Sequence, residues 1–326
     1  MTTPYFLRLI CLCAASFFLV HAVLGLALHL ASRSIVRFAH RMKPREATRF
    51  LLLLRLLPLT GSAIISLGIC LPSYLRLEPG ATQENVGMGF IFAALCGALV
   101  CISSLLRAGK AVSAARQFSR TCGKTCTRSS VPGTDLPIDI IESDAPVLLL
   151  TGVIKPRLVL SRVVMRTLTP QQLNSAIGHE EAHRASRDNF KRLLLLVSPE
   201  IIPFVRGFSS LDRAWAQFSE WAADDDASGD DLERSLSLAE SLVQVARMGA
   251  APRPLPLFTS FIPPDQDLSA RVNRLLLPPS FELKTWRRMR AVAGVAASAM
   301  FILFTLLLVH PSALQSVHQL LERLTH

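Results

Sequence analysis

The order of apolar and charged residues divides the chain into long apolar stretches and one region suited to water. Four stretches contain no Asp, Glu, Lys or Arg, namely residues 9–32, 56–75, 86–106 and 291–310. An α-helix rises 1.5 Å per residue, so about 20 residues cross a hydrocarbon core of about 30 Å. The pattern therefore predicts four transmembrane helices. The first is too long for the apolar part of a signal peptide, which favours a retained anchor.

Composition supports this interpretation. Of the 326 residues, 50% are hydrophobic and 18% are charged, and the mean hydropathy is +0.38. An ordinary soluble domain carries about 25% charged residues. These values exclude a disordered chain, a coiled coil and most soluble enzymes.

The spans predict three regions and an orientation. Residues 1–106 hold three spans, residues 107–290 form an inserted domain, and residues 291–326 hold the fourth span and a short tail. Lys and Arg are retained on the cytoplasmic side of a bacterial-type inner membrane. Six basic residues follow the first span: Arg33, Arg37, Arg41, Lys43, Arg45 and Arg49. The domain is therefore expected in the cytoplasm and both termini outside. Arg55, at the cytoplasmic end of the second span, is expected to extend to the interface.

The net charge of +11 does not indicate nucleic acid. Much of the excess lies beside the spans, where basic residues meet anionic lipid. No basic and aromatic interleaving or DNA-binding motif is present. We expect membrane lipid as a partner and no nucleic acid.

Within the inserted domain, short apolar runs at residues 138–141, 146–150 and 158–160 predict a small antiparallel sheet. Thr169, Pro170 and Gln172 then match a helix start, with Thr169 as the N-cap and Gln172 completing a capping box. That helix is expected to run to about Arg187. Residues 193–205 are strongly apolar but short, which favours a core helix or an interfacial segment rather than a span.

The predicted helix contains the sequence His179-Glu180-Glu181-Ala182-His183. Histidines four residues apart lie one turn apart on the same face of a helix, so both rings can bind one metal ion. In H-E-x-x-H sequences the intervening glutamate acts as the general base of a metalloprotease. Two surface histidines on an exposed helix are the alternative.

The third metal ligand is expected to be a carboxylate or a thiolate, because the domain holds only these two of the chain's eight histidines. A catalytic zinc ion takes three protein ligands and one water. Glu220 and Asp224 share a face of a second predicted helix, at about residues 211–227. Glu220 can bind the metal, while Asp224 accepts the outer N–H of a ligand histidine. A solvated acidic helix end is the alternative for these carboxylates.

In the order and spacing of these motifs, the chain resembles the BlaR/MecR family of integral-membrane zinc metallopeptidases. The motifs are Gly152, Lys155 to Arg157, Thr169-Pro170, His179 to His183, Asp188, and Glu220 with Asp224. The resemblance implies an α-helical membrane protein with four transmembrane helices and an inserted α+β, gluzincin-like domain. It implies that His179, His183 and Glu220 hold Zn²⁺, that Glu180 is the general base, and that Asp188 supports the site from outside the ligands.

Two departures qualify the resemblance. Family members that sense β-lactams carry a large penicillin-binding domain after the last span, whereas here only residues 311–326 follow it. Glu181 stands where the family usually has an apolar residue. The domain offers no spare histidine or tyrosine for a tetrahedral oxyanion, so Arg271 is the candidate donor, and stabilisation by zinc alone is the alternative.

These features predict a zinc-dependent endopeptidase that cuts a cytoplasmic or juxtamembrane protein. A transcriptional repressor and the chain itself are candidate substrates. A quality-control or processing protease similar to HtpX or to CAAX proteases would share the same metal site. A signalling scaffold with a structural zinc ion is the alternative from another functional class.

Overall fold

The computed structural model describes residues 5–77, 87–129, 137–201, 207–229, 231–249, 257–261 and 267–277. Its helices are α1 (Tyr5–Ala39), α2 (Pro44–Ile65), α3 (Leu71–Leu77), α4 (Met88–Thr125), α5 (Arg162–Thr167), α6 (Pro170–Ser186), α7 (Asp188–Val197), α8 (Ser209–Ser228), α9 (Leu232–Arg247) and α10 (Leu268–Leu276). A π-helical segment, Ser66–Cys70, joins α2 to α3. Its strands are β1 (Thr127–Ser129), β2 (Ile138–Ile141), β3 (Leu148–Thr151), β4 (Arg157–Ser161) and β5 (Thr259–Ser260).

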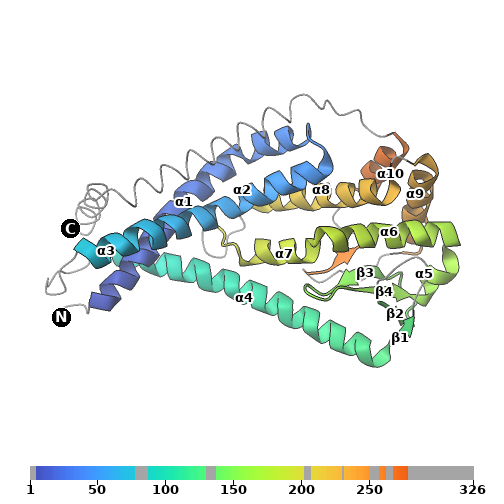
Figure 1. Cartoon of the computed structure of the whole chain (residues 1–326), viewed down its shortest axis with the longest axis horizontal. Coiled ribbons are helices and arrows are strands. Elements are labelled where there is room, and N and C mark those ends of the chain that lie inside the picture. The colour runs from blue at the N-terminus through green and yellow to red at the C-terminus, as the bar shows by residue number, and fades with distance from the viewer. Residues whose placement is uncertain are drawn as a thin grey trace.

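Three helices are long and apolar enough to cross a membrane: Tyr5–Ala39, Pro44–Arg76 and Met88–Cys122. They correspond to the first three predicted spans, but each helix is longer than its apolar stretch and includes charged residues beyond it. α4, for example, extends as far as the sheet (Figure 1). The fourth predicted span, residues 291–310, and the tail lie outside the described residues. The side of the membrane that each connection faces stays a prediction.

The spans approach each other closely through small residues, as membrane helices commonly do. Gly97 of α4 faces α1, and a Cβ atom there would lie 2.5 Å from the carbonyl oxygen of Ala14. Hydroxyl groups join the spans as well, because Ser66 Oγ donates to the carbonyl oxygen of Cys13 over 2.8 Å. α1 therefore contacts both α2 and α4.

The expectation that Arg55 extends to the membrane interface is wrong. Its side chain is 1% exposed and points into the protein. Arg55 Nε donates to Asp212 Oδ1 over 3.1 Å, and Arg55 NH1 donates to Ser198 Oγ over 2.8 Å. The guanidinium therefore forms its hydrogen bonds within the protein, with Asp212 and Ser198, and not with water at the interface.

The sheet is mixed, not antiparallel as the sequence predicted. Its strand order is β1-β2-β4-β3-β5, and β2 pairs with β4 in parallel. β4 inserts between β2 and β3, and this crossover gives β2 and β4 the same direction. The tight β3–β4 connection turns at Gly152, whose φ of +91° favours glycine.

α6 covers one face of this sheet, and its start agrees with the sequence (Figure 1). Thr169 Oγ1 accepts from the Gln172 backbone N–H, and the Gln172 side chain accepts from the Thr169 N–H. Pro170 occupies the first turn. Ala176 and Ile177 then pack on strand leucines and on α9. The sheet thereby fixes the helix that carries the H-E-x-x-H sequence.

The apolar segment at residues 193–205 begins as α7, which lies between α4 and α2. Leu193 and Leu196 pack beside α4 residues, whereas Leu195 packs with the cluster of α1, α2 and α8. This arrangement matches the core-helix alternative for its first half. Residues 202–206 lie outside the described residues.

Candidate metal centre

The two histidines of the H-E-x-x-H sequence lie together in the interior. His179 and His183 are both 0% exposed, on the face of α6 that meets α8. Their Nε2 atoms are 3.1 Å apart. The surface-histidine alternative is therefore wrong.

α8 brings Glu220 to the same point. Glu220 Oε2 lies 3.4 Å from His179 Nε2, and Glu220 Oε1 lies 3.6 Å from His183 Nε2. Neither oxygen accepts a hydrogen bond in the described structure, although Glu220 is fully buried. These three side chains form a group that can hold a metal ion, with ligand atoms within 4.8 Å of one another.

The outer nitrogen of each ring faces its own carboxylate. His183 Nδ1 lies 2.7 Å from Asp188 Oδ2, and His179 Nδ1 lies 2.9 Å from Asp224 Oδ1. A carboxylate accepts hydrogen bonds, so a neutral ring at either position is expected to carry its proton on Nδ1 and to present a lone pair at Nε2. Asp224 is 1% exposed, which excludes a solvated helix end for this residue.

The electrostatics of this centre favour a cation. With both rings neutral, two lone pairs and a carboxylate would converge on one buried point, where they repel one another unless positive charge lies between them. Burial lowers the pKa of His183, but Glu220 and Asp188 outweigh burial and raise the pKa to about 10. The surroundings therefore hold a proton on this ring in the absence of metal, and a metal ion would replace that proton.

The spacing of the ligand atoms is somewhat wider than zinc requires. Zinc binds nitrogen and oxygen at about 2.0–2.1 Å in a tetrahedron, whose ligands are then about 3.3 Å apart. The two Nε2 atoms are 3.1 Å apart, and each lies 3.4 or 3.6 Å from a different oxygen of Glu220; with one ligand atom from each residue, the three atoms lie within 4.8 Å of one another. The donor atoms are of the kind that zinc binds, and the group could hold Zn²⁺ once these atoms move closer together.

Glu180 lies beside this group and is also fully buried. Its Oε2 accepts a hydrogen bond from Thr259 Oγ1 over 3.2 Å, while its Oε1 has no partner in the described structure. Burial raises the pKa of Glu180 to about 7, although the neighbouring His183 and His179 oppose this shift. Near neutral pH this carboxyl group can both accept and release a proton.

Arg271 of α10 contacts two carboxylates of the centre, Asp224 and Glu220. It donates to both oxygens of Asp224 over 2.9 and 2.6 Å, and to the carbonyl oxygen of Phe261 over 2.8 Å. Its NH1 atom also lies 3.4 Å from Glu220 Oε2. This guanidinium therefore orients Asp224. Its role as an oxyanion donor stays a prediction.

Sequence reasoning missed three residues of this centre. Ser219 Oγ donates to Asp188 Oδ2 over 2.8 Å, and Thr259 bonds Glu180 from strand β5. The Arg192 NH2 atom lies 3.7 Å from Glu220 Oε1, with the side chain 21% exposed. Of these three residues, only Ser219 could have been suspected from the sequence, because it is adjacent to the candidate ligand Glu220. Thr259 and Arg192 reach the centre only through the tertiary fold.

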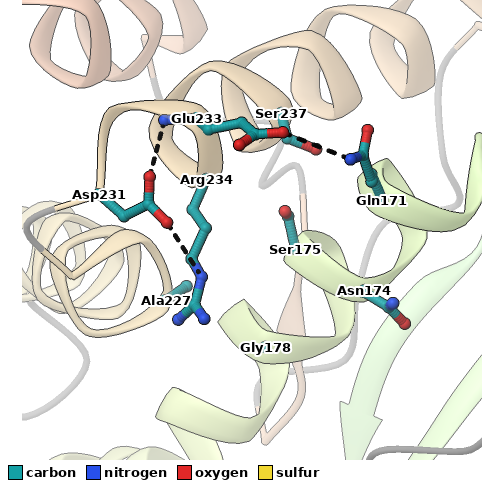
Figure 2. A pocket seen from close by; sticks show the side chains of 9 residues that line it. All are labelled: Gln171, Asn174, Ser175, Gly178, Ala227, Asp231, Glu233, Arg234 and Ser237. Atoms are coloured by element: carbon teal, nitrogen blue, oxygen red, sulfur yellow. Dashed lines mark hydrogen bonds and ion pairs between the residues drawn. The ribbon is translucent and has the colours of Figure 1, made fainter.

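A separate hollow of about 430 Å³ lies where α6, α8 and α9 meet, and none of the candidate ligands lines it. Figure 2 shows some of its polar side chains bonded to one another. Gln171 bonds Glu233, and Arg234 pairs with Asp231. Because none of the residues of the metal centre lines it, this hollow is not part of that centre.

Comparison with known proteins does not assign the chain to a family. No model of a known protein family matches it, and no curated protein matches it significantly. The resemblance to the BlaR/MecR family therefore rests on the sequence motifs alone. The structure adds three long apolar helices and the buried His179, His183 and Glu220 group.

Proposed function

We propose that this chain is a membrane-bound, zinc-dependent endopeptidase. One observation carries the proposal. A buried carboxylate with an unpartnered oxygen, Glu180, lies on the same helix as two converging imidazoles, and Glu220 completes a three-ligand group. Three protein ligands leave one coordination position for water or substrate, as in catalytic zinc sites.

Bound Zn²⁺ would supply a Lewis acid that polarises the scissile carbonyl and lowers the pKa of water. The chain's own residues supply the proton transfers. Glu180 Oε1 accepts a proton from the attacking water and later donates it to the leaving amide nitrogen. In the metal-free chain the pKa of this group is about 7, so it can hold or release a proton near neutral pH.

Two arginines are candidates to stabilise the developing oxyanion. Arg271 is 2% exposed and donates three hydrogen bonds to Asp224 and Phe261. Arg192 is more accessible and has an unpartnered, buried Nε atom in the described structure. A lower cleavage rate in Arg271→Ala, with zinc binding retained, would support Arg271 as the donor. The same result in Arg192→Ala would support Arg192.

We further propose that the substrate is a cytoplasmic or juxtamembrane protein. The close packing of α8 against α1 and α2 supports this, because it keeps the metal centre next to the spans. A transcriptional repressor, the chain itself or a damaged membrane protein would all meet this requirement. Fragments that differ in abundance between cells with wild-type protein and cells with Glu180→Gln would identify the substrate.

The structural-zinc alternative is less well supported. A structural zinc site is closed by four protein ligands, whereas the described residues offer a group of three. A structural site also has no use for Glu180, whose burial without a partner at Oε1 carries a desolvation cost.

The decisive test uses the purified full-length protein with Zn²⁺ and a peptide library from a digested bacterial proteome. Wild type is expected to cleave peptides, and a chelator is expected to stop cleavage. Glu180→Gln is expected to lower the rate at least about 100-fold, because general-base catalysis contributes about 10²–10⁴. Zinc content, measured by mass spectrometry, should stay near one ion per chain.

Glu181→Gln is the matched control, because it makes the same change one residue along α6. It should retain the wild-type rate. Cleavage that persists in Glu180→Gln would contradict the proposal. So would wild-type protein that binds no zinc.

A further inference from the structure

Arg55 is a charged residue that is fully enclosed by protein, next to the second apolar stretch. It lies on α2 within the candidate span Pro44–Arg76, and it is 1% exposed. Besides Asp212 and Ser198, its guanidinium contacts the carbonyl oxygen of Pro199 at 3.3 Å and Glu200 Oε1 at 3.5 Å. The Phe208 ring covers it, 4.1 Å from the guanidinium carbon. Burying a charge is costly unless it is paired and hydrogen-bonded, as this guanidinium is.

Apart from Asp212 on α8, the partners of Arg55 belong to one segment, the connector between α7 and α8 (residues 198–208). The structure describes residues 198–201 and 207–208 of it. Glu200, near the start of the connector, bonds to Phe208 at its end and to Arg107 of α4. Its Oε2 accepts from the Phe208 backbone N–H over 3.3 Å, and its Oε1 accepts from Arg107 of α4 over 3.4 Å.

α1 contacts the same connector along one face. His21 Nε2 lies 3.0 Å from the carbonyl oxygen of Glu200, and His29 Nδ1 lies 2.7 Å from that of Gly207. Between them, Gly25 lets Ile201 approach, because a Cβ atom on Gly25 would be 2.9 Å from Ile201 Cγ1. All three described spans therefore hold the connector.

The connector joins the two halves of the metal centre. α7 directly follows α6, which carries His179 and His183, and α8 carries Glu220. Arg55 also bonds Asp212, which lies eight residues before Glu220 on α8. At 1.5 Å per residue, this ion pair is about 12 Å from the metal ligand along one continuous helix. A shift of α2 would thus be transmitted to Glu220.

Stability alone does not account for this cluster. Burying charges costs desolvation, and well-packed apolar side chains often replace a buried ion pair without loss of stability. Such clusters are better known for fixing the register of packed elements. Arg55 binds both α8 and the connector, as a register-fixing residue must.

We propose that Arg55 is a positioning residue for the metal centre. It fixes the axial position of α8 against α2, and so sets the distance between Glu220 and the two histidines. The spans are then part of the metal centre's support, not only its anchor. The metal-binding part of this inference rests on the proposed function.

The test compares Arg55→Lys and Asp212→Asn with wild type, using full-length protein in lipid nanodiscs. Lysine keeps the charge but cannot bond Asp212, Ser198 and Glu200 together. Arg49→Lys is the matched control, because Arg49 is an exposed arginine on the same helix. Titration with Zn²⁺ and the visible absorption of bound Co²⁺ report the metal site. Hydrogen exchange of residues 216–224 reports α8 without metal.

In Arg55→Lys and Asp212→Asn we expect faster exchange in residues 216–224, at least ten-fold weaker Zn²⁺ binding and a shifted Co²⁺ spectrum. Exchange in β4 and the helical circular dichroism should be unchanged, which separates positioning from unfolding. Arg49→Lys should match wild type in every measurement. Wild-type exchange in residues 216–224 of both variants would overturn the inference. A wild-type protein that binds no Zn²⁺ would overturn the proposed function instead, and the exchange data would still decide the role of Arg55.

Discussion

At the residue scale, the candidate metal centre is a set of buried charges that hold one another in place. Asp188 and Asp224 orient the two imidazoles through Nδ1, and Arg271 in turn fixes Asp224 with two hydrogen bonds. Burial raises the pKa of Asp224, but Arg271 and His179 outweigh burial and lower it to about 2. Asp224 is therefore ionised at neutral pH and remains an acceptor for His179.

Asp224→Asn should weaken Zn²⁺ binding about 10–100-fold, because partners of ligand histidines contribute this much to metal affinity. An amide cannot match the charge of the carboxylate at His179. Asp225→Asn is the control, because Asp225 pairs with Arg274, away from the histidines. Competition with a chromophoric chelator measures both affinities. Equal affinities would show that Asp224 does not support the metal.

Glu180 should make the metal-free protein less stable as pH rises. Its folded pKa of about 7 lies above the ordinary value of 4.5, so the folded state binds more protons between these values. Stability from this group is complete below about pH 4.5 and is lost as pH rises through 7. A shift of this size corresponds to about 3 kcal/mol.

Metal-free Glu180→Gln should therefore unfold at a higher temperature than wild type at pH 8. The two curves should approach each other towards pH 4.5, because both side chains are then neutral. Thermal scans in detergent with excess chelator measure this difference. A gap that does not vary with pH would contradict the assignment of the shift to Glu180.

At the scale of elements, a break between two helices places Asp188. Arg187 adopts a left-handed conformation, with φ of 55°, between α6 and α7. The chain bends there, so Asp188 can reach back to His183 in the preceding helix. α7 then runs between α2 and α4 and leads into the connector. The helix pair α6–α7 thus links the metal centre to the spans.

The contact between α1 and α4 depends on Gly97. A Cβ atom there would lie 2.5 Å from the backbone oxygen of Ala14, which cannot move without moving α1. Gly97→Ala should therefore destabilise the protein by about 1–3 kcal/mol, as overpacking commonly does. Gly109→Ala, on the same helix with no atom within 4 Å of the added Cβ, should be neutral or stabilising. Thermal unfolding of both variants in detergent provides the comparison, and equal midpoints would contradict the close contact.

At the scale of the whole molecule, the spans and the metal-bearing helices share a core. Leu28 of α1 and Leu51 of α2 pack with Phe208, Trp215 and Phe218. α2 and α8 lie side by side along this core (Figure 1). The face of α8 opposite the metal centre is therefore covered by membrane helices, not by the sheet.

A fragment of residues 107–290, without the fourth predicted span, should accordingly be poorly soluble and bind Zn²⁺ much more weakly than the full chain. Without residues 1–106, the apolar face of α8 has no cover. Co-expression of residues 1–106 as a separate chain should restore binding. Sedimentation and zinc titration measure these outcomes. A soluble, monomeric fragment with full zinc affinity would contradict the shared core.

The sequence by itself determined the features that depend on local order. Apolar length predicted three spans that the structure describes, Thr169 and Gln172 predicted the start of α6, and the spacing of His179 and His183 placed both rings on one helix face. The spacing of Glu220 and Asp224 likewise placed both residues on one face of α8. That this face packs against α6 could only be suggested from the sequence. Each of these features follows from the helical repeat or from the bilayer thickness, which act over a few residues or one segment.

Only the tertiary structure decided the crossover that makes β2 and β4 parallel, the inward position of Arg55, and the approach of Thr259 and Arg192 to the metal centre. These arrangements join residues far apart in the chain, such as Arg55 and Asp212. No local pattern specifies such pairs, because a charged side chain binds whichever partner the packing of apolar surfaces brings within reach. The physical reason is that burial of apolar surface is non-directional and sets the global arrangement, and polar contacts are then selected within it.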